Sequence, residues 1–123
     1  MEQLLLHLIG DYITQTDRMA REKTKDWAAA IIHAIFYGMP FALIASPIAV
    51  SVIILTHAVI DRYRLARFIV FAKNWSDNRS LKWSECSATG YPDSMPPWLA
   101  FWLLIIADNT MHLCINYAAI RWL

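Results

Sequence analysis

Long apolar runs separated by short polar links predict four helical segments along this chain. The expected helices cover residues 2–21, 26–46, 47–73 and 97–122, and a polar loop covers residues 74–96. Gly38 and Pro40 predict a kink in the second helix, and Pro47 suits the first turn of the third. No internal repeat is present. The expected fold class is therefore all-α, in a single membrane domain over residues 1–123.

The apolar content is typical of a membrane protein rather than a small soluble globule. Hydrophobic residues make up 58% of the 123 residues, and the mean hydropathy is +0.36. A spanning helix needs roughly 20 predominantly apolar residues. The second segment fits best, the third is apolar in its first half, and the first turns polar from Thr14 onward. We expect an integral membrane helical bundle of about four helices, three of them spanning and the N-terminal one partly inserted.

Basic residues gather in the link between the first two helices and along the second half of the third. They are Arg18, Arg21, Lys23 and Lys25, and then Arg62, Arg64, Arg67 and Lys73. The positive-inside rule places both groups, and with them the loop 74–96, in the cytoplasm. Eleven basic and ten acidic residues leave a net charge of only +1, so no nucleic-acid-binding surface is expected. The expected partner is the lipid bilayer, whose anionic headgroups the basic run contacts.

The two cysteines give no sign of a disulfide or a zinc site. Cys86 and Cys114 are far apart and form no CxxC pair. Their surroundings in the sequence predict a loop thiol at Cys86 and a helix-packing thiol at Cys114.

Every histidine lies in or beside an apolar stretch, and three of them are spaced four residues from an aspartate. The pairs are His7 with Asp11, His57 with Asp61, and Asp108 with His112, while His33 stands alone. Ionisable side chains are costly in hydrocarbon and usually mark a pathway, a relay or a ligand site. Residues four apart share a helix face, so each pair forms a polar stripe that a membrane bundle would turn inward.

Helical rise predicts that these groups lie in one layer. At about 1.5 Å per residue, His57 lies roughly 15 Å and Asp61 roughly 21 Å from the outer start of the third helix. Counted back from the end of the last helix, His112 and Asp108 fall at the same two depths, roughly 15 and 21 Å. His33 falls at roughly 20 Å in the second helix. The sequence therefore predicts one polar site near the middle of the bilayer.

Imidazoles combined with carboxylates suit a divalent transition metal, Zn, Mn, Fe or Ni, better than Ca or Mg. The candidate metal ligands are His7, Asp11, His33, His57, Asp61, Asp108 and His112. They exceed one tetrahedral shell, so either two metals bind or some aspartates orient histidines. A bound metal would lower the pKa of a water molecule, and the candidate catalytic residues are the general bases Asp11, Asp61 and Asp108.

Other interpretations of the His/Asp pattern remain open. The pairs could be hydrogen bonds between helices, worth about 1 kcal/mol each. Asp61 could instead pair with the neighbouring arginines, Arg62, Arg64 or Arg67. A proton or ion path through the layer is a further interpretation.

The order of the motifs resembles the domain-of-unknown-function 3307 family, small membrane proteins of tailed phages, prophages and bacteria. The motifs are HxxxDxxxQ from His7 to Gln15, the histidine at position 33, HxxxD from His57 to Asp61, and DNxxH from Asp108 to His112. The resemblance implies a multi-helix, phage-type integral membrane protein placed in the host inner membrane. It implies no particular activity.

Two functions follow from the pattern and the resemblance together. One is a metalloprotein, with hydrolysis of a lipid-linked or phosphate-ester substrate as its candidate activity; the family pattern is similar to that of membrane-bound metal-dependent hydrolases. The other is a non-catalytic phage membrane factor that binds a host membrane protein or alters the bilayer, as in superinfection exclusion, defence blocking or holin-like lysis. Assembly into a homo-oligomer is compatible with either function.

Overall fold

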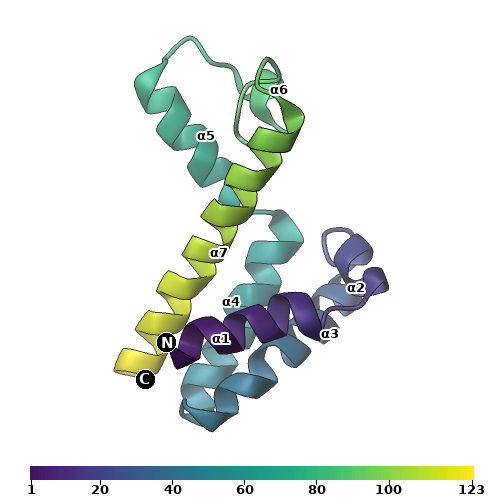
Figure 1. Ribbon diagram of the computed structural model, residues 1–123, viewed down its shortest axis with the longest axis vertical. Coiled ribbons are helices and arrows are strands. Elements are labelled where there is room, and N and C mark those ends of the chain that lie inside the picture. Colours follow the sequence, from purple (N-terminus) through teal and green to yellow (C-terminus); the bar gives the residue numbers. More distant parts are fainter. The chain divides into compact units, whose positions relative to one another are not determined.

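The computed structural model describes residues 1–123, with 76% of them in helices and no strand (Figure 1). The all-α class is therefore confirmed. The chain divides into two compact units, Met1–Tyr63 with His112–Leu123, and Arg64–Met111. The last helix, α7 (Pro97–Trp122), contributes residues to both units. The expected single membrane domain stays a prediction.

The first expected helix, over residues 2–21, is interrupted. It consists of α1 (Glu2–Leu8), which continues as the π-helix η1 (Ile9–Ile13), and of α2 (Asp17–Glu22). Thr16 is the N-cap of α2, and its hydroxyl accepts a hydrogen bond from the Met19 amide at 3.3 Å. A threonine cap satisfies an amide that has no partner inside the helix, and it therefore starts a new helix here.

The second helical segment contains α3 (Trp27–Gly38) and the 3₁₀ helix η2 (Met39–Leu43). Asp26 caps α3, because its carboxylate accepts from the Ala29 amide at 3.0 Å. The helix type changes at the place where Gly38 and Pro40 predict a kink. In Figure 1, α3 runs beside α4 (Pro47–Tyr63) within the first unit.

The third expected helix, over residues 47–73, is two helices. It begins at Pro47, as predicted, but α4 ends at Tyr63 and α5 (Ala66–Asp77) starts three residues later. Between them Arg64 has a φ of 52°, the left-handed region that non-glycine residues rarely adopt. The Arg64 guanidinium donates to the Ala88 carbonyl oxygen at 2.9 Å inside the second unit, which holds this conformation.

The second unit has its own small core of Val70, Tyr91 and Ala100. The expected loop 74–96 is shorter than predicted, because α5 continues to Asp77 and a short helix, α6 (Trp83–Cys86), follows. Whether this segment lies in the cytoplasm stays a prediction.

Both cysteines are free, but their surroundings are the reverse of those predicted. Cys86 is buried at the end of α6, whereas Cys114 is exposed on α7. Burial raises the pKa of the Cys86 thiol above its usual value, with a smaller contribution from the charges of Glu85 and Asp93. A short helix in the predicted loop is what buries Cys86, and the loop composition does not reveal it.

One helix, α7, is long and apolar enough to cross a membrane by length and composition. The apolar stretch Trp27–Leu43 is shorter, and α4 has 17 residues. The three spanning helices expected from the hydropathy pattern are thus not established. The pattern counted apolar residues across the two helix ends, at Gly38 and Tyr63, that the structure places inside those segments.

Candidate metal centre

Six of the seven side chains predicted as ligands lie in the first unit, and none of the six is more than 7% exposed. They are His7, Asp11, His33, His57, Asp61 and His112. They come from α1, η1, α3, α4 and α7. They lie beside the apolar core of the same unit, where Tyr37, Phe41 and Ile53 are fully buried. Burial of several ionisable groups is costly unless they pair with one another or with a metal.

Four donor atoms form a compact set, which we call the four-donor set: Asp11 Oδ1, His33 Nε2, His57 Nε2 and Asp61 Oδ2. His33 Nε2 lies 3.3 Å from each of the two carboxylate oxygens. His57 Nε2 lies 3.5 Å from the Asp11 oxygen and 3.2 Å from the Asp61 oxygen. The two imidazole nitrogens are 3.0 Å apart. All four side chains are buried, so the set is shielded from water.

These distances are those expected between the ligands of a metal ion. Ligands about 2.0–2.1 Å from a tetrahedral zinc lie about 3.3 Å from one another. Five of the six separations, from 3.0 to 3.5 Å, scatter around that value, and the two carboxylate oxygens lie within 4.8 Å of each other. Hydrogen bonds alone fit less well, because each nitrogen carries at most one proton and yet faces two oxygens and the other nitrogen at similar distances. The donor set therefore fits a divalent cation at its centre.

The second oxygen of each aspartate faces another histidine. Asp11 Oδ2 lies 3.7 Å from His7 Nε2, and Asp61 Oδ1 lies 3.4 Å from His112 Nε2. The His57 and His112 rings are 4.3 Å apart, centroid to centroid. Each carboxylate is therefore held between the four-donor set and one outlying histidine.

Tyr37 supports the cluster formed by the six buried side chains, and this role was not predicted from the sequence. Its hydroxyl accepts a hydrogen bond from the Asn116 amide at 2.6 Å and lies 2.8 Å from His7 Nδ1. Because the hydroxyl accepts from Asn116, its own proton is available for Nδ1, which leaves the His7 proton on the nitrogen that faces Asp11. The Tyr37 ring also stacks on the His57 ring, with centroids 3.6 Å apart. Tyr37 lies four residues after His33 and so shares its helix face, and this spacing is the sequence signal that could have identified it.

Lys23 also reaches the cluster. Its ammonium nitrogen lies 2.7 Å from Asp61 Oδ2 and 3.3 Å from His33 Nε2. Lys23 is one of the basic residues of the link predicted to be cytoplasmic, and no pattern in the sequence distinguishes it from the others there. Only the turn between α2 and α3 brings its side chain inward.

The alternative partners considered for Asp61 are wrong. Arg62 donates to the Thr24 carbonyl oxygen at 2.8 Å, and Arg64 donates to that of Ala88. Arg67 donates to the Ser87 carbonyl oxygen at 2.9 Å. These arginines follow Asp61 in the sequence but point toward backbone carbonyls, whereas the Asp61 carboxylate turns into the core of the first unit.

Asp108 and Gln15, which the sequence motifs also include, are not among the six clustered side chains. Asp108 lies in the second unit, half-buried, one helical turn before His112 on α7. Gln15 follows the end of η1, where the chain is no longer helical, so the stripe that begins at His7 ends at Asp11. The role of Asp108 as a ligand or base stays a prediction.

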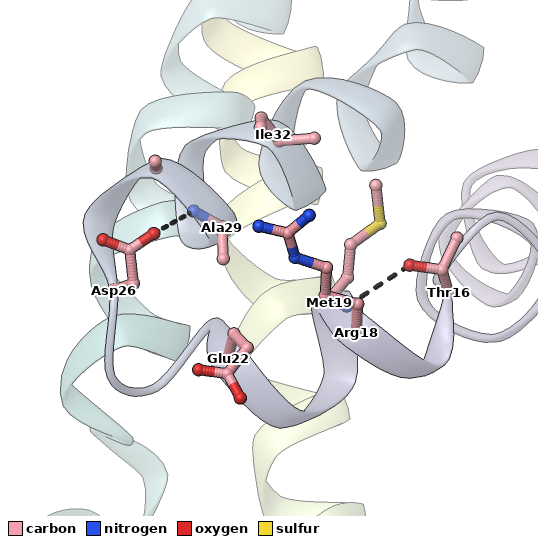
Figure 2. Close-up of a pocket in the computed structure, with 8 residues that line it drawn as sticks. Thr16, Arg18, Met19, Glu22, Asp26, Ala29 and Ile32 are labelled. Atoms are coloured by element: carbon pink, nitrogen blue, oxygen red, sulfur yellow. Dashed lines mark hydrogen bonds between the residues drawn. The ribbon is translucent and has the colours of Figure 1, made fainter.

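A hollow of about 420 Å³ lies between α2 and α3 and is separate from the cluster (Figure 2). Figure 2 shows the Arg18 and Met19 side chains between the two helices, with the Asp26 carboxylate at the start of α3. None of the six clustered side chains lines this hollow. The hollow and the buried candidate centre are therefore different places in the first unit.

Residues 1–85 match a protein family described as a protein of unknown function (DUF3307). The matched region contains every residue of the four-donor set, together with His7 and Lys23. The chain matches no curated protein and no solved structure. Since the family match covers well over half of the sequence, the chain belongs to the DUF3307 family of proteins of unknown function.

Proposed function

We propose that this chain is a membrane-embedded metalloprotein that binds one divalent transition metal at the four-donor set and hydrolyses a lipid-linked or phosphate-ester substrate. The observation that carries the proposal is the geometry of two imidazole nitrogens and two carboxylate oxygens at separations of 3.0 to 3.5 Å. Six buried ionisable side chains in one small unit are hard to explain without a ligand. Hydrogen bonding between helices needs only one pair at a time.

The donor atoms favour Zn, Mn, Fe or Ni. Calcium and magnesium prefer shells made of oxygen, whereas half of the four-donor set is imidazole nitrogen. His7 and His112 face the outer oxygens of the two carboxylates, and in this proposal they orient Asp11 and Asp61 rather than bind the metal. One metal per chain is therefore the proposed stoichiometry.

The chemistry of hydrolysis follows from these positions. With four protein ligands in place, a water molecule would take a fifth position on the metal, which would lower the pKa of that water to about 7 and make it a nucleophile at neutral pH. Asp61 Oδ1, 3.4 Å from His112 Nε2, is the proposed general base that would take the proton from that water. Asp11, whose Oδ2 lies 3.7 Å from His7 Nε2, and Asp108 on α7 are the other two candidate bases.

The distribution of polar and apolar side chains supports a setting in the lipid bilayer. The first unit buries histidines and aspartates and exposes large apolar side chains, such as Leu43 at 81% and Leu55 at 67%. Such a protein has polar groups inside and an apolar surface, which water disfavours and lipid does not. The length and composition of α7 agree with a span. We propose that the protein lies in the inner membrane of a bacterial phage host, with the basic link between the first two helical segments on the cytoplasmic side.

Elemental analysis of detergent-purified protein tests the proposal. The wild type is expected to carry about one transition metal per chain, and His57→Ala is expected to lose it, because two nitrogens and two oxygens make up the set. Asp93→Asn, an exposed position in the second unit, is the matched control and keeps the metal. His112→Ala retains the metal with an affinity lower by about 10–100-fold, the usual cost of losing a residue that orients a ligand.

Absence of metal from correctly folded wild-type protein would overturn the proposal. In that case pH-dependent proton flux into liposomes, abolished by His33→Ala, would support a proton path through the same imidazoles. The His33 and His57 nitrogens are in hydrogen-bonding distance at 3.0 Å, which is the observation that favours this second function.

A further inference from the structure

Lys23 alone among the lysines and arginines forms an ion pair with an aspartate of the cluster. Its ammonium lies 2.7 Å from Asp61 Oδ2 and 3.3 Å from His33 Nε2, and both atoms belong to the four-donor set. The ammonium therefore occupies a position at one edge of the proposed metal shell. A positive group fixed beside a metal site has a consequence for the ligand that the site accepts.

The backbone holds Lys23 in this position. Lys23 is the C-cap of α2, and the carbonyl oxygen of the next residue, Thr24, accepts a hydrogen bond from the Arg62 guanidinium at 2.8 Å. Consecutive residues of α4, Asp61 and Arg62, thus contact consecutive residues of the α2–α3 turn. The Lys23 side chain is 18% exposed, whereas Asp61 is 5% exposed, so the lysine extends from the surface into the buried cluster. Its ammonium can move toward solvent without opening the core.

Charge balance indicates what happens when a metal arrives. Without metal, the Lys23 ammonium offsets part of the charge of two buried carboxylates, Asp11 and Asp61. A divalent cation at the four-donor set needs the same Asp61 oxygen and repels the ammonium. Two carboxylates then neutralise the metal fully, and the lysine is left with a positive charge and no anion of its own. The site with metal is therefore complementary to an anionic ligand.

We infer that Lys23 releases Asp61 when the metal binds and then binds an anionic oxygen of a phosphate-bearing substrate at the edge of the metal shell. The inference rests on the proposed metal centre and specifies its substrate class. A lysine ammonium is a compact point charge with three donors and a common phosphate ligand. A neutral ester would leave the positive charge of Lys23 without a counterion in a largely buried site.

Lys23→Met tests the inference, because methionine keeps most of the side-chain length and removes the charge. Lys25→Met is the matched control: it makes the same change two residues later, where the side chain is 69% exposed and lies 3.9 Å from Glu22. Two affinities are measured on full-length protein in micelles: that of Zn²⁺ or Mn²⁺ for the metal-free protein, and that of inorganic phosphate for the metal-loaded protein.

The two affinities are expected to change in opposite directions. Lys23→Met binds the metal at least about fivefold more tightly, the lower end of typical couplings between sites. It binds phosphate about tenfold more weakly, because a charge-assisted hydrogen bond is lost. Lys25→Met matches the wild type in both. If the substitution merely damaged the structure, it would weaken both the metal affinity and the phosphate affinity. A higher metal affinity together with a lower phosphate affinity therefore shows that Lys23 leaves Asp61 for the phosphate when the metal binds.

A second measurement needs no substitution. Reductive methylation of the wild type, read by mass spectrometry with Lys25 as the internal reference, is expected to modify Lys23 faster after metal is added. Equal rates with and without metal, or a metal affinity of Lys23→Met no higher than that of Lys25→Met, would overturn the inference. An equal phosphate affinity in Lys23→Met and the wild type would also overturn it. So would a result in which Lys23→Met loses affinity for acetate but keeps its affinity for phosphate, because the lysine would then bind a carboxylate rather than a phosphate. If the protein binds metal but Lys23→Met changes neither affinity, only this inference fails. If neither the wild type nor any variant binds metal, the proposed function fails.

Discussion

Tyr37→Phe is the substitution that best tests how the cluster is held in place. It removes one hydroxyl and keeps the ring that stacks on His57 at 3.6 Å. Two buried groups lose their partner at that hydroxyl, the Asn116 amide at 2.6 Å and His7 Nδ1 at 2.8 Å. Each net hydrogen bond is worth about 1 kcal/mol, so we expect a loss of about 2 kcal/mol in the free energy of unfolding. Metal affinity is expected to fall by about 10–100-fold, because His7 would no longer be oriented toward Asp11.

The assay is denaturant-induced unfolding in detergent micelles followed by circular dichroism, with metal titration of the folded protein. Tyr117→Phe is the matched control, since it removes the same hydroxyl from a side chain that is 57% exposed on α7. Surface substitutions of this kind change stability by about 0.5 kcal/mol or less. Equal stability of the two variants would refute the argument that the Tyr37 hydroxyl holds the cluster together. A loss of stability without any loss of metal affinity would show that it acts on the fold alone.

Three further outcomes are expected. Gly10→Ala lowers the thermal unfolding temperature, because a Cβ at this position would lie 2.6 Å from the Tyr37 ring and cost about 1–3 kcal/mol; unchanged melting would contradict this close packing. Asp26→Ala lowers the free energy of unfolding by about 1 kcal/mol, because the α3 cap is lost. Asp26→Asn, whose side chain can still cap the helix, retains most of that stability; equal losses in the two variants would contradict the capping role. Maleimide at neutral pH modifies Cys86 slowly in the folded protein and faster after unfolding in denaturant, because burial raises the pKa of the Cys86 thiol and keeps it protonated to higher pH; equal rates in the two states would disprove this.

Much of the candidate site could be predicted from the spacing of residues. His57 and Asp61 are four residues apart on an uninterrupted helix, so a shared face was assured once α4 formed. His33 has no acidic neighbour in the sequence, but its place in an apolar run indicated burial, and it is fully buried. The same arguments placed Asp108 beside His112, where the structure leaves Asp108 half-buried in the second unit.

The helix boundaries were harder to predict because their causes are not local. Gly38 marks the change of helix type after α3, and Pro47 marks the start of α4. These boundaries are local because glycine frees the backbone and proline restricts it whatever the rest of the chain does. Nothing in the sequence marks Arg64, whose left-handed conformation is held by a hydrogen bond to a residue 24 positions away. The capping threonine at position 16 was a usable signal that the hydrophobic pattern obscured.

By itself, the sequence determined that this chain forms apolar helices with a few ionisable side chains on their inner faces, because side-chain period and burial cost are properties of the local chain. Only the tertiary structure decided which oxygen faces which nitrogen. It set Asp11 opposite His33 and His57, placed the Tyr37 hydroxyl on His7, and brought Lys23 into the cluster. These contacts depend on how helices distant in the sequence pack and on the path of one turn, and local periodicity contains neither.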